Sequence, residues 1–332
     1  MRVRLASALA AMALVSACGA GGQEPGPAAG DAEADPTPQP RSAGLSGELI
    51  LEVNEPLEAV RIIRYDLETR RYVIEVDGSE ARWANAKIVF TQPCGAHNTG
   101  ERLAIADADG FVTPASPCDE DSIRTNLHSA AISFDGARVA AVDTEMLLEP
   151  IDPDEFMSAM TAARGQGVRV YDESGDEIGV LPGYASPAWT RDGDLIVAGT
   201  GKRGEAPYGI YKASADYKSV SRIDDGRLNN TIWSLVGHPQ ANKAAFVYNY
   251  QIWEIDLASG APKRRVVFDF PIAYVAYSPD GRRFAFVVAD PLEQGLKRGG
   301  DGVYYLHVFD GENVVDIPVD FIAGGPITWI AD

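Results

Sequence analysis

Few residues of this chain combine the types and spacings that carry out chemistry. Its four histidines stand far apart in the sequence, at His97, His128, His238 and His307. The sequence contains no Gly-x-Ser-x-Gly nucleophile elbow, no Ser-x-x-Lys pair and no His-Glu-x-x-His zinc-binding helix. It therefore predicts no catalytic residue, no metal site and no cofactor.

Two acidic clusters could in principle hold a cation. Residues 107–110 read Asp-Ala-Asp-Gly, as in a calcium loop, but the closing glutamate of such a loop is absent. Other copies of the repeat described below have a hairpin turn at this position, which favours a turn here as well. Residues 118–122 contain three consecutive acids. We interpret them as a solvated loop, with cation binding as the alternative.

The N-terminus resembles an export signal with a site for lipid attachment. Residues 1–18 contain two arginines and then an apolar segment from Leu5 to Ala17, too short for the roughly 20 residues of a membrane-spanning helix. The segment ends in Val-Ser-Ala-Cys, which resembles the lipobox of bacterial lipoproteins. This resemblance implies that Cys18 carries the lipid; an ordinary signal peptide is the alternative. Gly19 follows in place of an inner-membrane aspartate, which favours the outer membrane.

Residues 19–46 form the predicted tether between lipid and domain. They are rich in Gly, Pro, Ala and acidic residues, with Leu45 as the one large aliphatic side chain. Such a segment cannot bury enough apolar surface to offset its ordering entropy, so we expect it to be disordered. The net charge of −19 argues against nucleic acid or an anionic membrane surface as the main partner.

Two cysteines remain once Cys18 is assigned to lipid. An exported protein is oxidised, and no Cys-x-x-Cys motif is present, so Cys94 and Cys118 are predicted to form a disulfide. Two free buried thiols are the alternative.

A repeat of about 40–57 residues runs through the rest of the chain and predicts its fold. Each copy has a short apolar strand, a turn such as Ser278-Pro279-Asp280-Gly281, a second apolar strand, and a third strand ending in another polar turn. Turn positions fall at residues 85, 135, 192, 240, 280 and 332. Four antiparallel strands repeated six times indicate an all-β, six-bladed β-propeller over residues 47–332.

The last copy stops at its turn aspartate, and residues 47–53 resemble the second strand that it lacks. We therefore expect the innermost strand of one blade, Pro326-Ile327-Thr328-Trp329, to come from the C-terminus. The other three strands of that blade come from the N-terminal end of the domain. Such a closure would remove open sheet edges.

The turn motif and the aromatic third strand that ends in Asp and a Gly turn together resemble the TolB-like, WD-related six-bladed propeller family. The resemblance covers the chain after the tether. WD-repeat proteins differ, because Gly-His occurs once here, at Gly237-His238, with no Trp-Asp pair after it. TolB itself carries an α/β domain ahead of its propeller, where this sequence has the tether. The resemblance therefore implies no role in the Tol-Pal system.

The connections between second and third strands are long and should all emerge on one face. This long-loop face is the predicted binding surface. The longest insertion, near residues 143–166, is predicted to form a helix with Asp152 as N-cap. The candidate contacts on this face are His97, Arg102, His128, Phe156, Met160, Lys202, Arg203, Lys297 and Arg298. For Phe156 and Met160 packing on the propeller is the alternative, and for the Lys-Arg pairs it is solvation.

These features predict a lipid-anchored, noncatalytic binding or scaffold protein of the bacterial cell envelope. Its partner would be an envelope protein or a cell-wall component. The alternative is a propeller hydrolase or lyase that acts on a sugar, peptide or lactone in the central channel. A third possibility resembles the propeller of prolyl-oligopeptidase-like enzymes without the hydrolase domain. Converging His, acidic and Arg side chains in the channel would favour an enzyme, and an apolar channel would favour binding.

Overall fold

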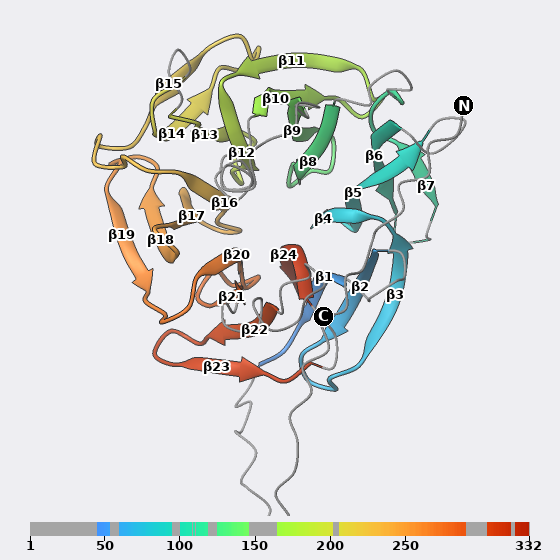
Figure 1. Cartoon of the computed structure of the whole chain (residues 1–332), viewed down its shortest axis with the longest axis vertical. Helices are drawn as coiled ribbons and strands as arrows, with labels where there is room; N and C mark the ends of the chain where they lie inside the picture. The colour runs from blue at the N-terminus through green and yellow to red at the C-terminus, as the bar shows by residue number, and fades with distance from the viewer. Residues whose placement is uncertain are drawn as a thin grey trace, which may run out of the picture. The chain divides into compact units, whose positions relative to one another are not determined.

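The computed structural model describes residues 45–53, 60–94, 100–107, 109, 111–118, 125–145, 165–201, 206–289, 304–319 and 323–331. These residues form 24 strands in six four-stranded antiparallel sheets, arranged as blades around a centre (Figure 1). The predicted all-β, six-bladed propeller is confirmed. The described part of the chain contains no helix that could cross a membrane.

Each blade is named here by its strands, written from the centre outward. Blade 1 has β24 (Ala323–Ile330), β1 (Glu48–Val53), β2 (Arg61–Asp66) and β3 (Tyr72–Asp77). Blade 2 has β4 (Ser79–Ala84), β5 (Lys87–Cys94), β6 (Gly100–Ala106) and β7 (Val112–Pro114). Blade 3 has β8 (Thr125–Ile132), β9 (Val139–Glu145), β10 (Gly165–Tyr171) and β11 (Glu177–Pro182).

The other three blades follow the same order. Blade 4 has β12 (Tyr184–Trp189), β13 (Leu195–Gly199), β14 (Gly209–Ala213) and β15 (Val220–Arg222). Blade 5 has β16 (Ile232–Gly237), β17 (Lys243–Tyr248), β18 (Gln251–Asp256) and β19 (Pro262–Val266). Blade 6 has β20 (Ile272–Tyr277), β21 (Phe284–Ala289), β22 (Tyr304–Phe309) and β23 (Val314–Ile317).

The ring closes through blade 1, as the sequence predicted. β24 pairs antiparallel with β1, with Trp329 opposite Leu49 and Thr328 opposite Ile50. The indole Nε1 of Trp329 donates a hydrogen bond to the backbone oxygen of Ser46 at 3.2 Å. The C-terminal strand therefore completes a blade whose other strands lie at the N-terminal end of the propeller.

Leu45 and Ser46 contact the propeller, although their surroundings in the sequence predict that they belong to the tether. Leu45 is only 5% exposed and packs with Leu49 and Trp329 in one hydrophobic cluster. A single leucine among Gly, Pro and Ala residues gave no periodic signal, so its burial could not be seen from the local pattern. Both residues therefore make propeller contacts, although they lie on the tether side of the expected boundary at residue 46.

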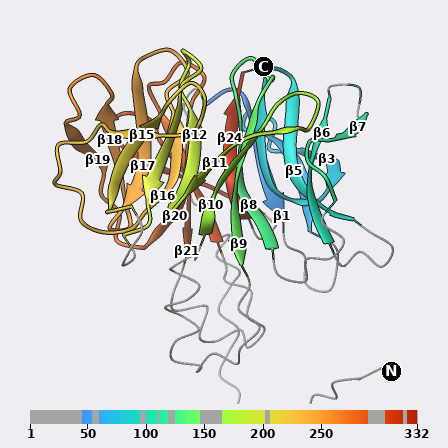
Figure 2. The same cartoon turned by 90° about the horizontal axis from the view of Figure 1, so that it is seen from above.

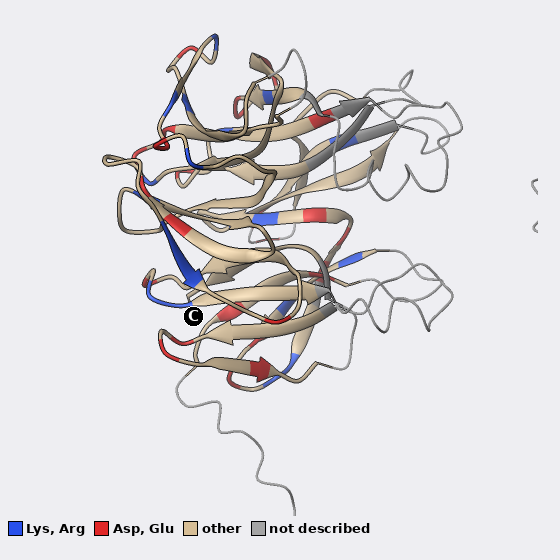
Figure 3. Ribbon diagram, turned by 60° about the vertical axis from the view of Figure 1, so that its left-hand side comes forward, with Lys and Arg blue, Asp and Glu red and all other residues tan. Residues whose placement is uncertain are grey.

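The hydrophobic core lies between neighbouring blades. The described residues form six buried clusters, several of which join side chains from adjacent sheets. In one of them, Trp189 of β12 donates from Nε1 to the backbone oxygen of Ala131 in β8 at 3.2 Å. Figure 3 shows charged residues mainly at turns and on the outer parts of the blades. Because each blade needs its neighbours to cover its faces, the ring is the unit of stability.

The turn motif is explained by its hydrogen bonds. In blade 6, the Oγ of Ser278 donates to Asp280 at 2.6 Å and accepts from the backbone N–H of Arg283 at 2.9 Å. Gly281 completes this turn with a φ of 71°, a conformation that glycine adopts most easily. In blade 5, His238 replaces the serine: its Nδ1 accepts from the N–H groups of Gln240 (3.0 Å) and Ala241 (2.9 Å).

His238 should make the stability of the propeller depend on pH. Its Nδ1 must be unprotonated to accept the two bonds, and burial holds the pKa of His238 below its ordinary value, with Glu254 opposing. The folded state then binds fewer protons than the unfolded state below about pH 6.5, so stability is lost as the pH falls from there. We therefore expect the urea concentration at half-unfolding to be lower at about pH 5 than at about pH 7.

A His238→Asn variant provides the control for this pH effect. The asparagine side chain does not titrate in this range and has an oxygen that can accept the same backbone hydrogen bonds. We expect its urea midpoint to depend less on pH than that of the wild type. An equal slope in both proteins would contradict the role assigned to His238.

Candidate functional site

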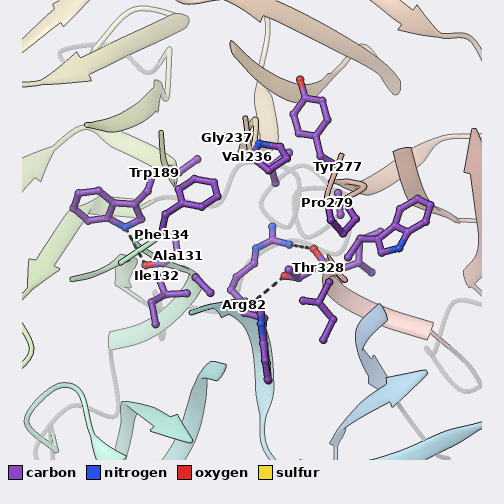
Figure 4. Close-up of a pocket in the computed structure, with 18 of the residues that line it drawn as sticks. Arg82, Ala131, Ile132, Phe134, Trp189, Val236, Gly237, Tyr277, Pro279 and Thr328 are labelled. Carbon is purple, nitrogen blue, oxygen red and sulfur yellow. Dashed lines mark hydrogen bonds between the residues drawn. The ribbon is translucent and has the colours of Figure 1, made fainter. Parts of the chain in front are cut away.

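A cavity of about 480 Å³ lies at the centre of the propeller (Figure 4). Its lining comes from all six innermost strands and from the short turns that follow them. Representative lining residues are Arg82, Ala131, Phe134, Ala188, Val236, Pro279 and Thr328. They lie within the last three residues of these strands or in the turns that follow, so the cavity lies at the short-turn end of the central channel. In Figure 2 the C-terminus marks this end.

β-Bulges shape the channel, because most of the innermost strands carry one residue in the left-handed conformation. These residues and their φ values are Glu80 (58°), Ser129 (51°), Ser186 (46°), Ser234 (50°) and Gly325 (63°). Each lies within a register shift between the innermost strand and the next strand. Such bulges bend a strand and re-aim its side chains, so they set the direction of the residues that line the cavity.

Hydrogen bonds between blades hold the bulges in place. The backbone N–H of Ser129 donates to Glu80 Oε2 at 3.0 Å, and the N–H of Glu80 donates to Glu52 Oε2 at 2.9 Å. In the opposite half of the ring, the N–H of Val275 donates to Ser234 Oγ at 2.9 Å. Four of the left-handed residues are not glycine, and their strain is sustained because these contacts fix them.

The walls of the cavity are mainly apolar. Among the described lining residues, the ionisable side chains are Arg82 and Tyr277. The hydroxyl of Tyr277 donates to Glu254 Oε2 at 3.1 Å, and burial raises the pKa of this tyrosine further above its ordinary value. Its ring and that of Trp189 point away from the middle of the cavity (Figure 4). The described lining therefore contains no acid–base pair for catalysis.

Arg82 extends from β4 into the middle of the cavity (Figure 4). Its Nη1 donates a hydrogen bond to the backbone oxygen of Ile327 in β24. Burial lowers the pKa of Arg82 to about 10, while the nearby carboxylate of Glu80 opposes the shift. Arg82 therefore remains a cation at neutral pH. No group of His, Cys, Asp and Glu that could hold a metal ion occurs in the described part of the chain.

The structure places two predicted site residues in a disulfide. Cys94 is the last residue of β5 and Cys118 follows β7, and a disulfide joins them within blade 2, with 5.9 Å between their Cα atoms. Arg102 lies on β6, where its Nη2 donates to Gln92 Oε1 at 3.3 Å and its Nε is buried without a hydrogen-bond partner. It does not line the cavity.

The other predicted site residues cannot be placed from the described residues. His128 lies in β8, but its side chain is not described. Those that lie outside the described residues are Cys18, His97, Phe156, Met160, Lys202, Arg203, Lys297 and Arg298. The helix is predicted near residues 143–166, but β9 extends to Glu145 and β10 begins at Gly165, which leaves residues 146–164 between the two strands. That interval also lies outside the described residues.

Arg82 is not among the predicted site residues, although the sequence contains a signal for it. Arg82 begins the shortened repeat copy at residues 82–90, whereas the equivalent position in the other five blades holds alanine, valine or threonine. Its counterparts in the other blades are Ala131, Ala188, Val236, Ala276 and Thr328. The signal in the sequence is therefore a long, charged side chain at a position where the other five blades have a shorter, uncharged one.

Comparison with known proteins identifies the fold. No protein-family profile and no curated protein sequence matches the chain. TolB from Acinetobacter baumannii has a similar structure, with a TM-score of 0.61 and 14% identity, over 86% of this chain and 67% of that one. A protein from Agrobacterium tumefaciens described as TolB gives 0.55 and 14%, over 86% and 100%.

Oligogalacturonate lyase from Vibrio parahaemolyticus is a more distant structural neighbour. It has a TM-score of 0.50 and 12% identity, over 77% of this chain and 70% of that one. Identities at this level establish the architecture and leave activity open. The comparisons therefore assign to the described propeller the fold of the TolB-like six-bladed β-propellers.

Proposed function

We propose that this chain is a noncatalytic binding protein of the bacterial cell envelope that accommodates an apolar part of its ligand or partner in the central cavity. The observation that carries the proposal is the cavity of about 480 Å³ with mainly apolar described walls. Cavities of this size and character are typical of binding sites. The export signal and Cys18 support lipid attachment to a membrane, for which incorporation of labelled palmitate that is lost in Cys18→Ser is the test.

The alternative, a hydrolase or lyase, has less support. Oligogalacturonate lyase shares the fold, so the architecture is compatible with catalysis. General acid–base chemistry, however, needs proton-transferring groups near the reacting atoms. The ionisable side chains of the described lining are Arg82 and Tyr277, and the hydroxyl of Tyr277 already donates its hydrogen bond to Glu254. A binding function needs only the shape and the apolar walls that are present.

The long-loop face remains a second proposed contact surface, for an envelope protein or a cell-wall component. Apart from Arg102 and His128, its candidate residues lie outside the described part of the chain, so the support comes from the length of the loops in the sequence. The described strand ends that flank these loops lie at the end of the channel opposite the cavity, so the two proposed surfaces can be tested separately.

Site-specific photo-crosslinking in the native envelope tests the cavity as a binding site. We expect p-benzoylphenylalanine at Phe134, which is 38% exposed and lines the cavity, to capture a ligand or partner. The same replacement of Phe111, an aromatic residue 67% exposed beside β7, is the matched control and should not capture it. Identical products from both positions, or none from Phe134, would refute the cavity proposal.

A further inference from the structure

We propose that the central cavity binds a carboxylate carried on an apolar body, and that the guanidinium of Arg82 recognises the carboxylate. This inference rests on the proposed binding function and adds the chemical class of the ligand. The observation behind it is that Arg82 is the one charged side chain in a described lining that is mainly apolar.

The propeller architecture does not require an arginine at position 82. The corresponding position of the other five innermost strands, one or two residues before the strand ends, holds a small or medium side chain. These residues also line the cavity: Ala131, Ala188, Val236, Ala276 and Thr328. Five blades therefore pair and pack with such a residue at this position. The packing of the blades therefore does not account for the length and charge of Arg82, and ligand binding would account for both.

Arg82 has no carboxylate bonded to it. Its one hydrogen bond goes from Nη1 to the backbone oxygen of Ile327, and within the described chain it forms no ion pair. A guanidinium has five N–H donors, so most remain for a ligand. Burial of this cation costs free energy, and Glu80 offsets that cost only in part, because the pKa of Arg82 remains lowered. An anionic group in the cavity would offset that cost.

Glu80, which lies on the same strand, does not take the place of such a ligand. Its Oε2 accepts the backbone N–H of Ser129 at 3.0 Å instead of pairing with Arg82. Burial also raises the pKa of Glu80, so this side chain is protonated more readily than an ordinary glutamate. Glu52 accepts the N–H of Glu80 nearby. Arg82 is the one charged side chain among the described lining residues, so an anion with a single charge balances it.

A carboxylate fits these constraints better than other anions do. It carries one charge, and its two oxygens match the planar N–H fork of a guanidinium. The apolar walls contributed by Phe134, Val236 and Ile327 would cover the rest of the molecule. A free aromatic or aliphatic acid and the C-terminus of an apolar peptide both supply this chemistry.

Calorimetric titration with matched acid and amide probes tests the proposal. The probes are 3-phenylpropionate with 3-phenylpropanamide, and N-acetyl-Leu-Phe with its C-terminal amide. We expect the wild-type protein to bind at least one acid about tenfold more tightly than its amide at neutral pH and low salt. Arg82→Gln should remove the preference, and Arg82→Lys should keep part of it. Preference for the free acid or for the peptide identifies the source of the carboxylate.

Arg191→Gln is the matched control, because Arg191 also donates to a neighbouring blade's backbone oxygen, that of Pro239 at 3.1 Å, but does not line the cavity. It should leave both affinities unchanged. Thermal melts establish that each variant is folded before titration. Equal affinity for acid and amide in the wild type, an acid preference that survives Arg82→Gln, or no binding of any probe would overturn the inference. Crosslinking from Phe134 decides the proposed binding function independently of these outcomes.

Discussion

Removal of residues 326–332 should prevent the propeller from folding cooperatively or lower its melting temperature by at least about 10 °C. The deletion takes away Ile327 and Trp329, which are 1% and 5% exposed in the cluster between blades 1 and 6. The loss of one buried tryptophan side chain costs about 3–5 kcal/mol, a large part of the stability of an ordinary domain. It also exposes the inner edge of β1, which is then free to pair with another chain.

A shorter truncation separates ring closure from a general effect of shortening the chain. Removal of residues 331 and 332 alone leaves β24 intact, and Ala331 is exposed. We expect the melting temperature of this protein to match that of the full chain, measured by circular dichroism. Closure by β24 would be refuted if the longer deletion melted at the temperature of the full chain. The tendency of the longer deletion to self-associate can be followed by light scattering.

The fold could be predicted because its signals are local and repeated. Turns such as Ser278-Pro279-Asp280-Gly281 have a defined hydrogen-bond pattern and require a left-handed residue, so residue type reports the backbone directly. The closing strand could be predicted for the same reason, because its partial motif ends where residues 47–53 continue it. Leu45 was missed because one buried side chain beside a tether has no repeat to reveal it.

The candidate site was harder to predict because it depends on bulges with no distinctive residue type. Ser186 and Ser234 adopt φ values of 46° and 50°, although serine shows no preference for that region. Contacts between blades impose this conformation, and the bulges then direct side chains at the channel. The lengths of the loops favour the opposite face as the binding surface, whereas the cavity lies at the end with the short turns. Arg82 could be recognised only by comparing equivalent positions across the blades.

Replacement of both Cys94 and Cys118 by alanine should lower the free energy of unfolding by about 3 kcal/mol, because the disulfide closes a loop with a sequence separation of 24. The effect should centre on β7, whose three residues are all exposed and contribute little burial of their own. Urea unfolding measures the loss, and hydrogen exchange at the N–H of Ala115, which bonds the backbone oxygen of Leu103 at 2.8 Å, reports whether this edge opens. The reduced wild-type protein is the control and should match the double variant in both measurements. If the oxidised wild type and the double variant unfold at the same urea concentration, the edge is held by its strand pairing and the disulfide has no stabilising role.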